Sequence, residues 1–217
     1  TESVCPYCGV GCQIEYNVKD NEIKYVNGID GPANKNRLCV KGRFGFDYVS
    51  NPERLTKPLI RIKGKEKDLH PSINFSNLHE YFREATWDEA LDHAANGFLE
   101  IKKKRNGKSN LAGFGSAKCS NEEAYLFQKL IRTGFNTNNV DHCTRLCHAS
   151  SVAALLETIG SGAVTAPFYE VEHSEVIIVI GANPTENHPV AATFFKNAAK
   201  KGSKLIVMDP RGHALKK

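Results

Sequence analysis

Two stretches near the start of the chain alternate apolar and polar residues, QIEYNV at 13–18 and EIKYVNG at 22–28. A period of two is typical of strands that bury one face. The polar residues 19–21 between the two stretches form a turn, so the sequence predicts a β-hairpin. This hairpin would hold Cys12 and Cys39 close in space although they are far apart in the sequence.

Residues 51–85 follow no clear period. They contain Pro52, Pro58 and Pro71 together with the charged run GKEKD at 64–68. Prolines and clustered charges interrupt helices and strands. We therefore expect this stretch to be irregular, forming a domain boundary and a surface excursion.

Helical patterns alternate with short apolar runs from residue 86 onward. Capping boxes at 86–89 and 120–123 predict the starts of two helices. The apolar stripe of the first helix consists of Ala90, Leu91, Ala94, Ala95 and Phe98. LAGFG at 111–115 predicts a short buried strand, and SSVAALLETIG at 150–160 predicts another helix.

The last part of the chain gives the clearest pattern. EVIIVIG at 175–181 is a continuous apolar run, typical of a parallel strand that is covered on both faces. PVAATFFKNAAKKG at 189–202 predicts a helix with proline at its first position and glycine after its end. KLIVMD at 204–209 predicts a second strand. Strand, helix and strand at this spacing form a right-handed βαβ unit.

The predicted fold class is therefore α/β, with a small β-rich domain followed by domains built from Rossmann-like βαβ units. We place the β-rich domain at residues 1–60. The first part of an α/β domain would follow at 61–140. Residues 141–217 would form the start of a second α/β domain, which we expect to bind a cofactor.

Composition adds mainly limits. Hydrophobic residues make up 41% and charged residues 24% of the 217 positions, as in ordinary globular proteins. The longest apolar run, VIIVIGA, is too short to cross a bilayer, and the first residues do not form a secretory signal. We expect a cytoplasmic protein without a direct membrane span, leaving open an export signal removed before Thr1. The net charge of +5 is mild. KKKR at 102–105 fits a solvated helix end better than a nucleic-acid patch, so no nucleic-acid partner is expected.

Seven cysteines are too many for an ordinary intracellular core, and they favour metal binding or catalysis over disulfides. Four of them form the pattern Cys5-x2-Cys8-x3-Cys12 with Cys39 returning later. Two short spacings and one distant return suit a [4Fe-4S] cluster, although a structural zinc ion accepts the same four thiolates. Lys41 follows closely. It is either an ordinary surface lysine or a cation that offsets the charge of a cluster.

Polar residues follow both strands of the final βαβ unit. Gly181, Asn183, Thr185, Glu186 and Asn187 come after the first strand, and Asp209 and Arg211 after the second. Ligands of open α/β sheets bind at the carboxyl ends of strands, so a nucleotide-bearing ligand is expected here. A polar loop that merely caps the helix is the alternative. The motif G-x-G-x-x-G is missing, which argues against ordinary NAD binding.

The stretch DHCTRLCHAS at 141–150 concentrates thiols and imidazoles. It contains His142, Cys143, Cys147 and His148. These residue types allow a zinc clip, a redox pair of thiols, or a thiolate and an imidazole with separate tasks.

Further motifs extend this picture over nearly the whole chain. They are CPYCGVGC, RLCVKGRFGFDYVSNPERLTKPLIR, TWDEAL, GFGSAKCSNEEAYLFQKL, NVDHCTRLCHASSVAAL, GSGAVTAPF, VIIVIGANPTENHPVA and KLIVMDPRG. Together they resemble the molybdenum- or tungsten-dependent formate dehydrogenases, within the bis-molybdopterin guanine dinucleotide oxidoreductases. Two features depart from that family. Residues 64–82 are longer than expected, and Cys119 stands where glycine is expected.

The resemblance implies a role for each candidate residue. Cys147 matches the single protein ligand of the Mo or W ion, and a soft thiolate suits a metal that dithiolene sulfurs already hold. His148 matches the histidine that helps with the substrate proton, and Arg145 matches a basic residue nearby. Lys41 matches the lysine between the cluster and a pterin. The remaining matches are the [4Fe-4S] ligands Cys5, Cys8, Cys12 and Cys39, and residues 183–187 and 209–211 beside the guanosine end of a pterin cofactor.

The implied activity is the reversible oxidation of formate to CO2, with electrons leaving through a pterin, Lys41 and the cluster. Implied partners are formate or CO2, the remaining C-terminal part of the catalytic subunit, and electron-transfer subunits that carry iron–sulfur centres or flavin. Family members are several hundred residues long, so residues 1–217 alone are expected not to oxidise formate.

Three alternatives remain beside the formate dehydrogenase hypothesis. A nitrate reductase of the same family is disfavoured by the Cys147–His148 pair, because those enzymes use a different residue after the ligand. A non-catalytic iron–sulfur electron-transfer subunit would have no use for that pair. A zinc-stapled nucleotide-binding module would be distinguished by its metal.

Overall fold

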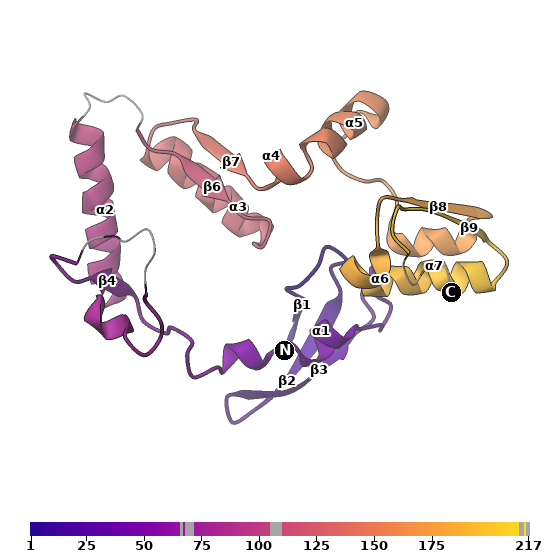
Figure 1. The fold of residues 1–217 in the computed structure, drawn as a ribbon, viewed down its shortest axis with the longest axis horizontal. Helices are drawn as coiled ribbons and strands as arrows, with labels where there is room; N and C mark the ends of the chain where they lie inside the picture. Colours follow the sequence, from indigo (N-terminus) through magenta and orange to yellow (C-terminus); the bar gives the residue numbers. More distant parts are fainter. Residues whose placement is uncertain (66, 68–71, 105–109, 213–214, 216–217) are drawn as a thin grey trace. The chain divides into compact units, whose positions relative to one another are not determined.

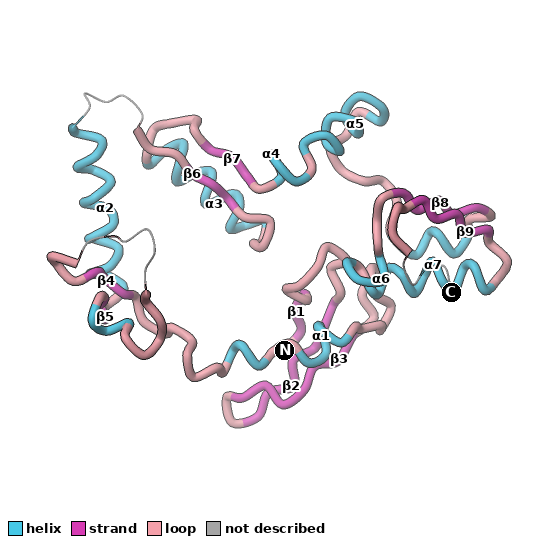
Figure 2. Tube along the Cα trace, in the orientation of Figure 1, coloured by secondary structure: helices cyan, strands magenta, loops and turns pink. Residues whose placement is uncertain are grey.

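The computed structural model describes residues 1–65, 67, 72–104, 110–212 and 215 (Figure 1). These residues fall into two compact units, which we describe separately. Unit 1 consists of Thr1–Asn51 and Ile159–Lys217, and unit 2 consists of Pro52–Thr158. Both units combine helices and strands (Figure 2), which agrees with the predicted α/β class. The predicted domain limits at residues 60 and 140 stay a prediction.

Unit 1 begins with an antiparallel sheet in the order β1-β2-β3. Its strands are β1 (Glu2–Val4), β2 (Gln13–Lys19) and β3 (Glu22–Gly28). Asp20 and Asn21 join β2 to β3 with φ angles of 55° and 59°. Positive φ at both central residues is the requirement of a two-residue type I′ turn. Ile14 and Val26 are 1% and 0% exposed and form the buried face. The predicted hairpin is thus confirmed.

The chain then continues through α1 (Val40–Phe44) and the 3-10 turn η1 (Asp47–Val49). It returns to unit 1 with the 3-10 helix η4 (Phe168–His173), β8 (Val176–Ile180), α6 (Pro184–Asn187), α7 (Pro189–Lys200) and β9 (Lys204–Met208). Strands β8 and β9 pair in parallel. The predicted strand–helix–strand unit is confirmed, with strand ends that differ by one residue.

Helix α7 contributes to two apolar clusters. Val190, Ala191 and Phe194 join the core that holds Cys5, Cys12, Ile14 and Val26. Ala192 and Ala198 pack against Ile177 and Val179 of β8. The helix therefore links the cysteine-rich hairpin region to the parallel strands.

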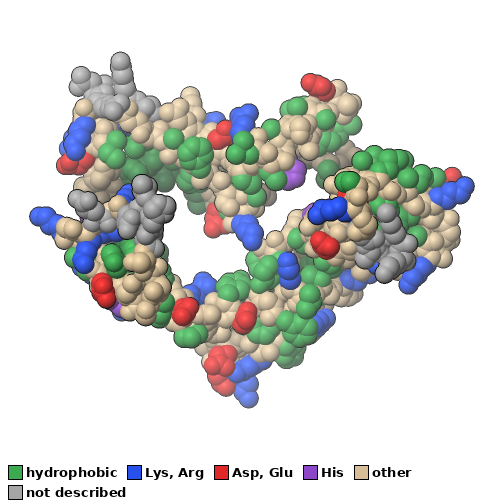
Figure 3. Space-filling view, in the orientation of Figure 1, with side chains coloured by type: hydrophobic (Ala, Val, Ile, Leu, Met, Phe, Trp, Pro, Cys, Tyr) green, Lys and Arg blue, Asp and Glu red, His purple; other side chains and the backbone are tan. Residues whose placement is uncertain are grey.

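Only one face of the β8–β9 pair is covered within the described residues. Side chains on the opposite face are between 41% and 67% exposed; they are Val176, Ile178, Ile180, Ile206 and Met208. Figure 3 shows hydrophobic side chains gathered over β8. The sequence predicted burial on both faces, and in this part of the structure that expectation is not met.

Unit 2 opens with a small antiparallel pair that the sequence did not predict. Strands β4 (Leu59–Arg61) and β5 (Phe82–Glu84) pair around the 3-10 turn η2 (Leu78–Glu80). Each strand has three residues, too few to show a period of two. The charged run at 64–68 lies partly outside the described residues.

Helix α2 (Trp87–Lys104) starts where its capping box predicts, and Thr86 Oγ1 accepts the N–H of Glu89 at 3.2 Å. Arg105 of the basic run lies outside the described residues. The apolar stripe of α2 is largely exposed. Phe98 alone of its large side chains makes an aromatic contact among the described residues, with the ring of Phe135 at 4.7 Å.

The rest of unit 2 is a strand–helix–strand unit followed by two helices. Its elements are β6 (Gly113–Gly115), α3 (Asn121–Lys129), the π-helical turn η3 (Leu130–Gly134), β7 (Val140–His142), α4 (Thr144–Cys147) and α5 (Ala149–Ile159). Strands β6 and β7 are parallel. The predicted strand at 111–115 is confirmed, but Phe114 is 83% exposed, so that strand is not buried as predicted.

Candidate functional site

The four cysteines of the N-terminal motif lie together in unit 1. Cys5 and Cys12 are buried, whereas Cys8 and Cys39 are partly exposed. The N–H of Cys5 donates to the carbonyl of Cys12 at 2.8 Å and closes the loop between them. Gly11 permits the tight return before Cys12 with a φ of 70°. Cys39 precedes the first residue of α1 and so caps this helix.

Electrostatics within this group show that the thiols are close to one another. Burial, and to a smaller extent the neighbouring Cys5, Cys8 and Cys39, raise the pKa of Cys12 to about 12. Burial also raises the pKa of Cys5, with smaller contributions in the same direction from Cys39 and Cys8. Two of the four thiols are buried, and all four would repel one another as thiolates, so ionised together they need positive charge among them. A metal centre supplies that charge, so the donor set fits an iron–sulfur cluster.

The same geometry does not form a ready mononuclear site. Among the described residues, no three His, Cys, Asp or Glu side chains come close enough together to hold one metal ion. A zinc ion needs its thiolates about 2.3 Å from one point. A [4Fe-4S] cluster instead binds its four thiolates through four separate irons.

Asn34 fastens the loop that returns to Cys39. Its side chain is fully buried and forms hydrogen bonds of 3.0 to 3.1 Å with Gln13, Ile29 and Arg37. These bonds tie the loop before Cys39 to the start of β2. Sequence reasoning missed Asn34, because an asparagine in a polar loop gives no local signal of burial.

Helix α1 packs directly on the motif. A Cβ atom on Gly42 would stand 2.5 Å from Leu38 Cδ1 and 3.4 Å from Cys5 Sγ, so only glycine permits this approach. The Tyr7 hydroxyl donates to the carbonyl of Gly45. Lys41 lies on the same short helix, with an exposed side chain. Its predicted place beside a cluster is compatible with this position and stays a prediction.

Cys147, His148 and Arg145 lie together on and just after α4. Cys147 is the last residue of this helix, and its Sγ is 3.9 Å from Nε2 of His148. Leu146 stands between Arg145 and Cys147 in the sequence, and its side chain is 96% exposed. Helix α4 therefore projects from the described part of unit 2. The Arg145 Nε donates to Asp141 Oδ2 at 2.9 Å. The N–H of His142 and then this guanidinium hold the pKa of Asp141 below its ordinary value.

His142 has a different, structural role. Its Nδ1 accepts the N–H of Thr144 at 3.1 Å, so Nε2 carries the proton and donates to the carbonyl of Ser116 at 2.8 Å. Both ring nitrogens are therefore engaged. A zinc clip at 142–148 would lose this ligand, and the interpretation of Cys147 and His148 as residues with separate tasks is favoured.

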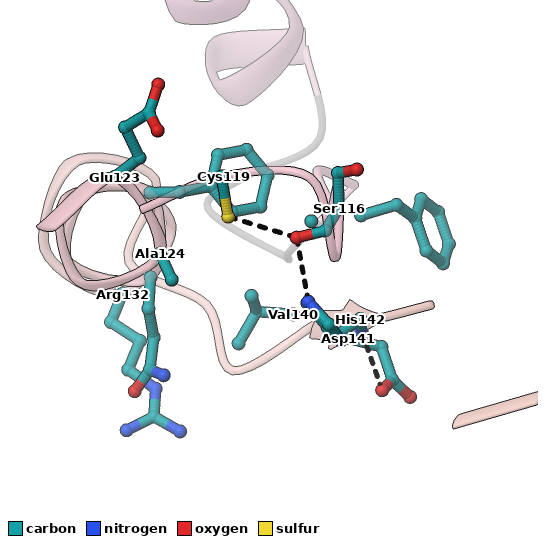
Figure 4. A pocket seen from close by; sticks show the side chains of 12 residues that line it. Ser116, Cys119, Glu123, Ala124, Arg132, Val140, Asp141 and His142 are labelled. Carbon is teal, nitrogen blue, oxygen red and sulfur yellow. Dashed lines mark hydrogen bonds between the residues drawn. The ribbon is translucent and has the colours of Figure 1, made fainter. Parts of the chain in front are cut away.

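A cavity of about 600 Å³ lies at the carboxyl ends of β6 and β7, beside α3. Figure 4 shows Cys119 and His142 pointing at the same carbonyl oxygen of Ser116. The Cys119 Sγ lies 3.0 Å from this oxygen. Ser120 and Glu123 complete the predicted capping box at the start of α3. Cys119, which departs from the resembled family, thus lines a cavity next to the segment that leads to Cys147.

The two polar loops after β8 and β9 lie side by side. The N–H of Gly181 donates to the carbonyl of Met208 at 2.9 Å, which joins the two strand ends. Asn183 Oδ1 accepts the hydroxyl of Thr185 at 2.5 Å. Asp209 Oδ1 accepts the N–H of Arg211 at 2.8 Å. The structure therefore brings the predicted nucleotide-binding residues 181–187 and 209–211 to one edge, and their ligand stays a prediction.

Comparison with known proteins decides the family. Residues 1–51 match the molybdopterin oxidoreductase Fe4S4 domain, and residues 54–217 match the molybdopterin oxidoreductase domain. The chain belongs to the molybdopterin oxidoreductases. These two domains imply a molybdopterin cofactor, which the family resemblance predicted, and a [4Fe-4S] cluster, which the cysteine spacing also favoured.

Curated relatives agree with this family. The chain is 42% identical over 217 residues to "Probable oxidoreductase YjgC" of Bacillus subtilis, covering 99% of this chain and 20% of that protein. It is 41% identical over 213 residues to "Putative formate dehydrogenase YrhE" of the same organism, covering 97% of this chain and 20% of that protein. It is 41% identical over 217 residues to "Putative formate dehydrogenase SAR2393" of Staphylococcus aureus, with 99% and 20% covered. The chain thus spans about a fifth of the length of the curated relatives it matches.

A solved structure confirms the fold of this molybdopterin oxidoreductase chain. Acetylene hydratase from Pelobacter acetylenicus matches with a TM-score of 0.72 and 20% identity, over 99% of this chain and 28% of that one. The predicted molybdopterin oxidoreductase fold with an N-terminal iron–sulfur domain is therefore correct. Among the described residues, no helix combines the length and apolar character needed to cross a membrane.

Proposed function

We propose that this chain works in the catalytic subunit of a molybdenum- or tungsten-dependent formate dehydrogenase. One observation carries the proposal: an exposed thiol and an imidazole, Cys147 and His148, stand 3.9 Å apart at the end of α4. The names of two relatives, at 41% identity, point to the same substrate. Oxidation of formate to CO2 releases two electrons and one proton, so a site needs both a metal ligand and a proton acceptor.

The two side chains supply these functions. The soft Sγ of Cys147 suits a molybdenum or tungsten ion that also binds dithiolene sulfurs of two pterin guanine dinucleotides. The bound metal–pterin group supplies the two-electron acceptor. Nε2 of His148, on the same helix end, receives the proton of formate. Arg145, two residues before Cys147, forms an ion pair with Asp141 and brings a positive charge to the same short helix.

Unit 1 supplies the exit for electrons. Cys5, Cys8, Cys12 and Cys39 bind the [4Fe-4S] cluster in this proposal. Lys41 would lie between the cluster and a pterin, where its charge would offset the surrounding anions. The joined loops at 181–187 and 209–211 bind the guanosine end of one cofactor. Electron-transfer subunits that carry iron–sulfur centres or flavin then accept the electrons.

The test uses the complete catalytic subunit that contains this chain, purified anaerobically with its cofactors. Elemental analysis should find iron together with molybdenum or tungsten, and formate should reduce a viologen dye. We expect Cys147→Ser to abolish this activity and His148→Gln to lower it about 10²-fold to 10⁴-fold, the usual range of acid–base catalysis. Cys143→Ser is the matched control, because Cys143 is an exposed thiol on the same helical turn and has no assigned role.

Other outcomes identify the alternatives. Nitrate reduction by reduced viologen without formate oxidation would make the protein a nitrate reductase. Iron without molybdenum or tungsten, and no turnover, would indicate an electron-transfer subunit. Zinc alone would indicate a zinc-stapled module. Each of these results contradicts the proposal.

A further inference from the structure

The core around the cluster motif is built from two distant parts of the chain. Beside the hairpin residues, it includes Val190, Ala191 and Phe194 of α7, with Phe168 and Tyr169 of η4 packed against it. Residues 1–51 therefore do not bury their cysteines alone. The segment from η4 to α7 completes the apolar surroundings of Cys5 and Cys12.

Arg37 is the main polar link between these two parts. Its guanidinium carbon lies 4.0 Å from the ring centroid of Phe194, which is buried beneath it. One guanidinium nitrogen is 3.7 Å from Glu172 Oε1. Lys201 Nζ donates to the other Glu172 oxygen at 3.2 Å and is the largest cause of the lowered pKa of Glu172; Arg37 contributes less. The ring of Phe194 and the carboxylate of Glu172 thus both contact the guanidinium of Arg37.

No hydrogen bond joins the Arg37 guanidinium to Glu172. Nη1 of Arg37 and Oε1 of Glu172 are buried without a hydrogen-bond partner among the described residues. A guanidinium is a planar group that stacks on rings, and lysine cannot replace it in that respect. Asn34 holds the backbone of Arg37, whereas its guanidinium is placed by Phe194 and Glu172, both from the C-terminal part of unit 1.

Both cysteine-bearing loops touch that C-terminal part. Arg37 stands two residues before Cys39. On the other loop, a Cβ atom on Gly9, between Cys8 and Cys12, would lie 3.8 Å from Nε2 of His188. His188 precedes α7 and lies 6.3 Å from the Phe168 ring, centroid to centroid. Movement of η4 or α7 would thus reach both loops.

We propose that Arg37 is a positioning residue for Cys39, which clamps the Cys39 loop to η4 and α7 and so sets how this thiolate meets the cluster. The inference rests on the proposed assignment of Cys39 as a cluster ligand. It adds that η4 and α7, which contain no predicted ligand of the cluster, affect its geometry and its retention through Glu172 and Phe194.

The test compares Arg37→Met and Arg43→Met in the anaerobically purified holoprotein. Arg43 stands four residues after Cys39, and its side chain donates to Val26 and Asn27 of the hairpin. Its backbone N–H donates to the carbonyl of Cys39 at 3.0 Å, and methionine keeps this bond. The readouts are the low-temperature EPR spectrum of the reduced cluster, its midpoint potential, and the rate of iron loss to a chelator. We expect Arg37→Met to change the EPR line shape and potential and to speed iron loss about tenfold, as for a loss of one to two stabilising contacts.

Two further variants separate positioning from general stability. Arg37→Lys keeps the charge but not the planar stack, so it should restore only part of the spectrum. Glu172→Gln preserves the shape of the side chain and should shift the EPR spectrum in the same direction as Arg37→Met. If the Arg37→Met protein does not accumulate, Glu172→Gln serves as the test in its place. A wild-type spectrum in both Arg37→Met and Glu172→Gln, or equal changes in Arg43→Met, would overturn the proposal. A wild-type holoprotein without any [4Fe-4S] signal would overturn the ligand assignment itself.

Discussion

Asn34 offers the sharpest test of how the Cys39 loop is held. Its amide nitrogen donates to the carbonyl oxygens of Gln13, Ile29 and Arg37 at 3.0 to 3.1 Å. Its Oδ1 accepts the N–H of Gln13 at 3.0 Å. An amide has two hydrogens, so one of them is shared between two carbonyls. Asn34→Ala removes all four contacts without adding volume, and the affected loop leads directly to Cys39.

The free-energy cost of Asn34→Ala depends on which of its backbone partners keep another hydrogen bond. The Ile29 carbonyl also accepts the N–H groups of Gly31 and Asn36, at 2.7 and 3.2 Å. The Gln13 carbonyl also accepts the N–H of Ile29 at 3.1 Å. The loss therefore falls mainly on the Gln13 N–H and the Arg37 carbonyl. Each buried group left unpaired costs about 1 to 3 kcal/mol, which gives a total of about 2 to 4 kcal/mol once water reaches the loop.

Hydrogen exchange measures this energy locally. For peptides that cover residues 29–38, Asn34→Ala should raise the exchange rate about 30-fold to 900-fold, as about 1.4 kcal/mol corresponds to a factor of ten. Asn17→Ala is the control, because the Asn17 amide bonds to the Glu15 carboxylate outside the core and its loss should change exchange less than about threefold. Unchanged protection of residues 29–38 in Asn34→Ala would refute the reasoning.

Two further predictions concern the cluster motif. In the cluster-free chain, burial raises the pKa of Cys12 from 9.0 to about 12, so the folded state resists ionisation and its stability should fall as pH rises from about 9 to 12. Thermal unfolding across this range should show the fall in the parent and less of it in Cys12→Ser; identical pH profiles would contradict it. Gly42→Ala should cost about 1 to 3 kcal/mol through overpacking against Leu38 and speed iron loss. Gly97→Ala in open space on α2 should instead stabilise by about 1 kcal/mol, and a loss there would contradict the helix assignment.

Local signals explain what the sequence could predict of the fold. The hairpin followed from alternation and from the polar turn at 19–21, and α7 followed from Pro189 at its first position and Gly202 after its end. The pair β4–β5 was missed, because three-residue strands carry no period and their partners lie more than twenty residues apart. The exposed side of β8 was also not foreseen. An apolar run records how much of a strand prefers burial, and it does not identify the part of the chain that covers each face.

In the candidate site, too, local features were predictable from the sequence and non-local ones were not. Ligand spacing is a local property, so Cys5, Cys8, Cys12 and Cys39 were recognised from the sequence, and the loops at 181–187 and 209–211 followed from the ends of two strands. The surroundings that control these ligands are not local. The high pKa of Cys12, the closed hydrogen bonds of Asn34 and the stacking of Arg37 on Phe194 all depend on residues that meet only after folding. The candidate ligands were thus predictable from residue types at fixed spacing. The burial and contacts that affect these ligands arise from packing within unit 1, which the sequence does not show. A variant on α7 or η4, far in sequence from any cysteine, is therefore expected to change the cluster more than a variant on an exposed turn of the hairpin that carries Cys12.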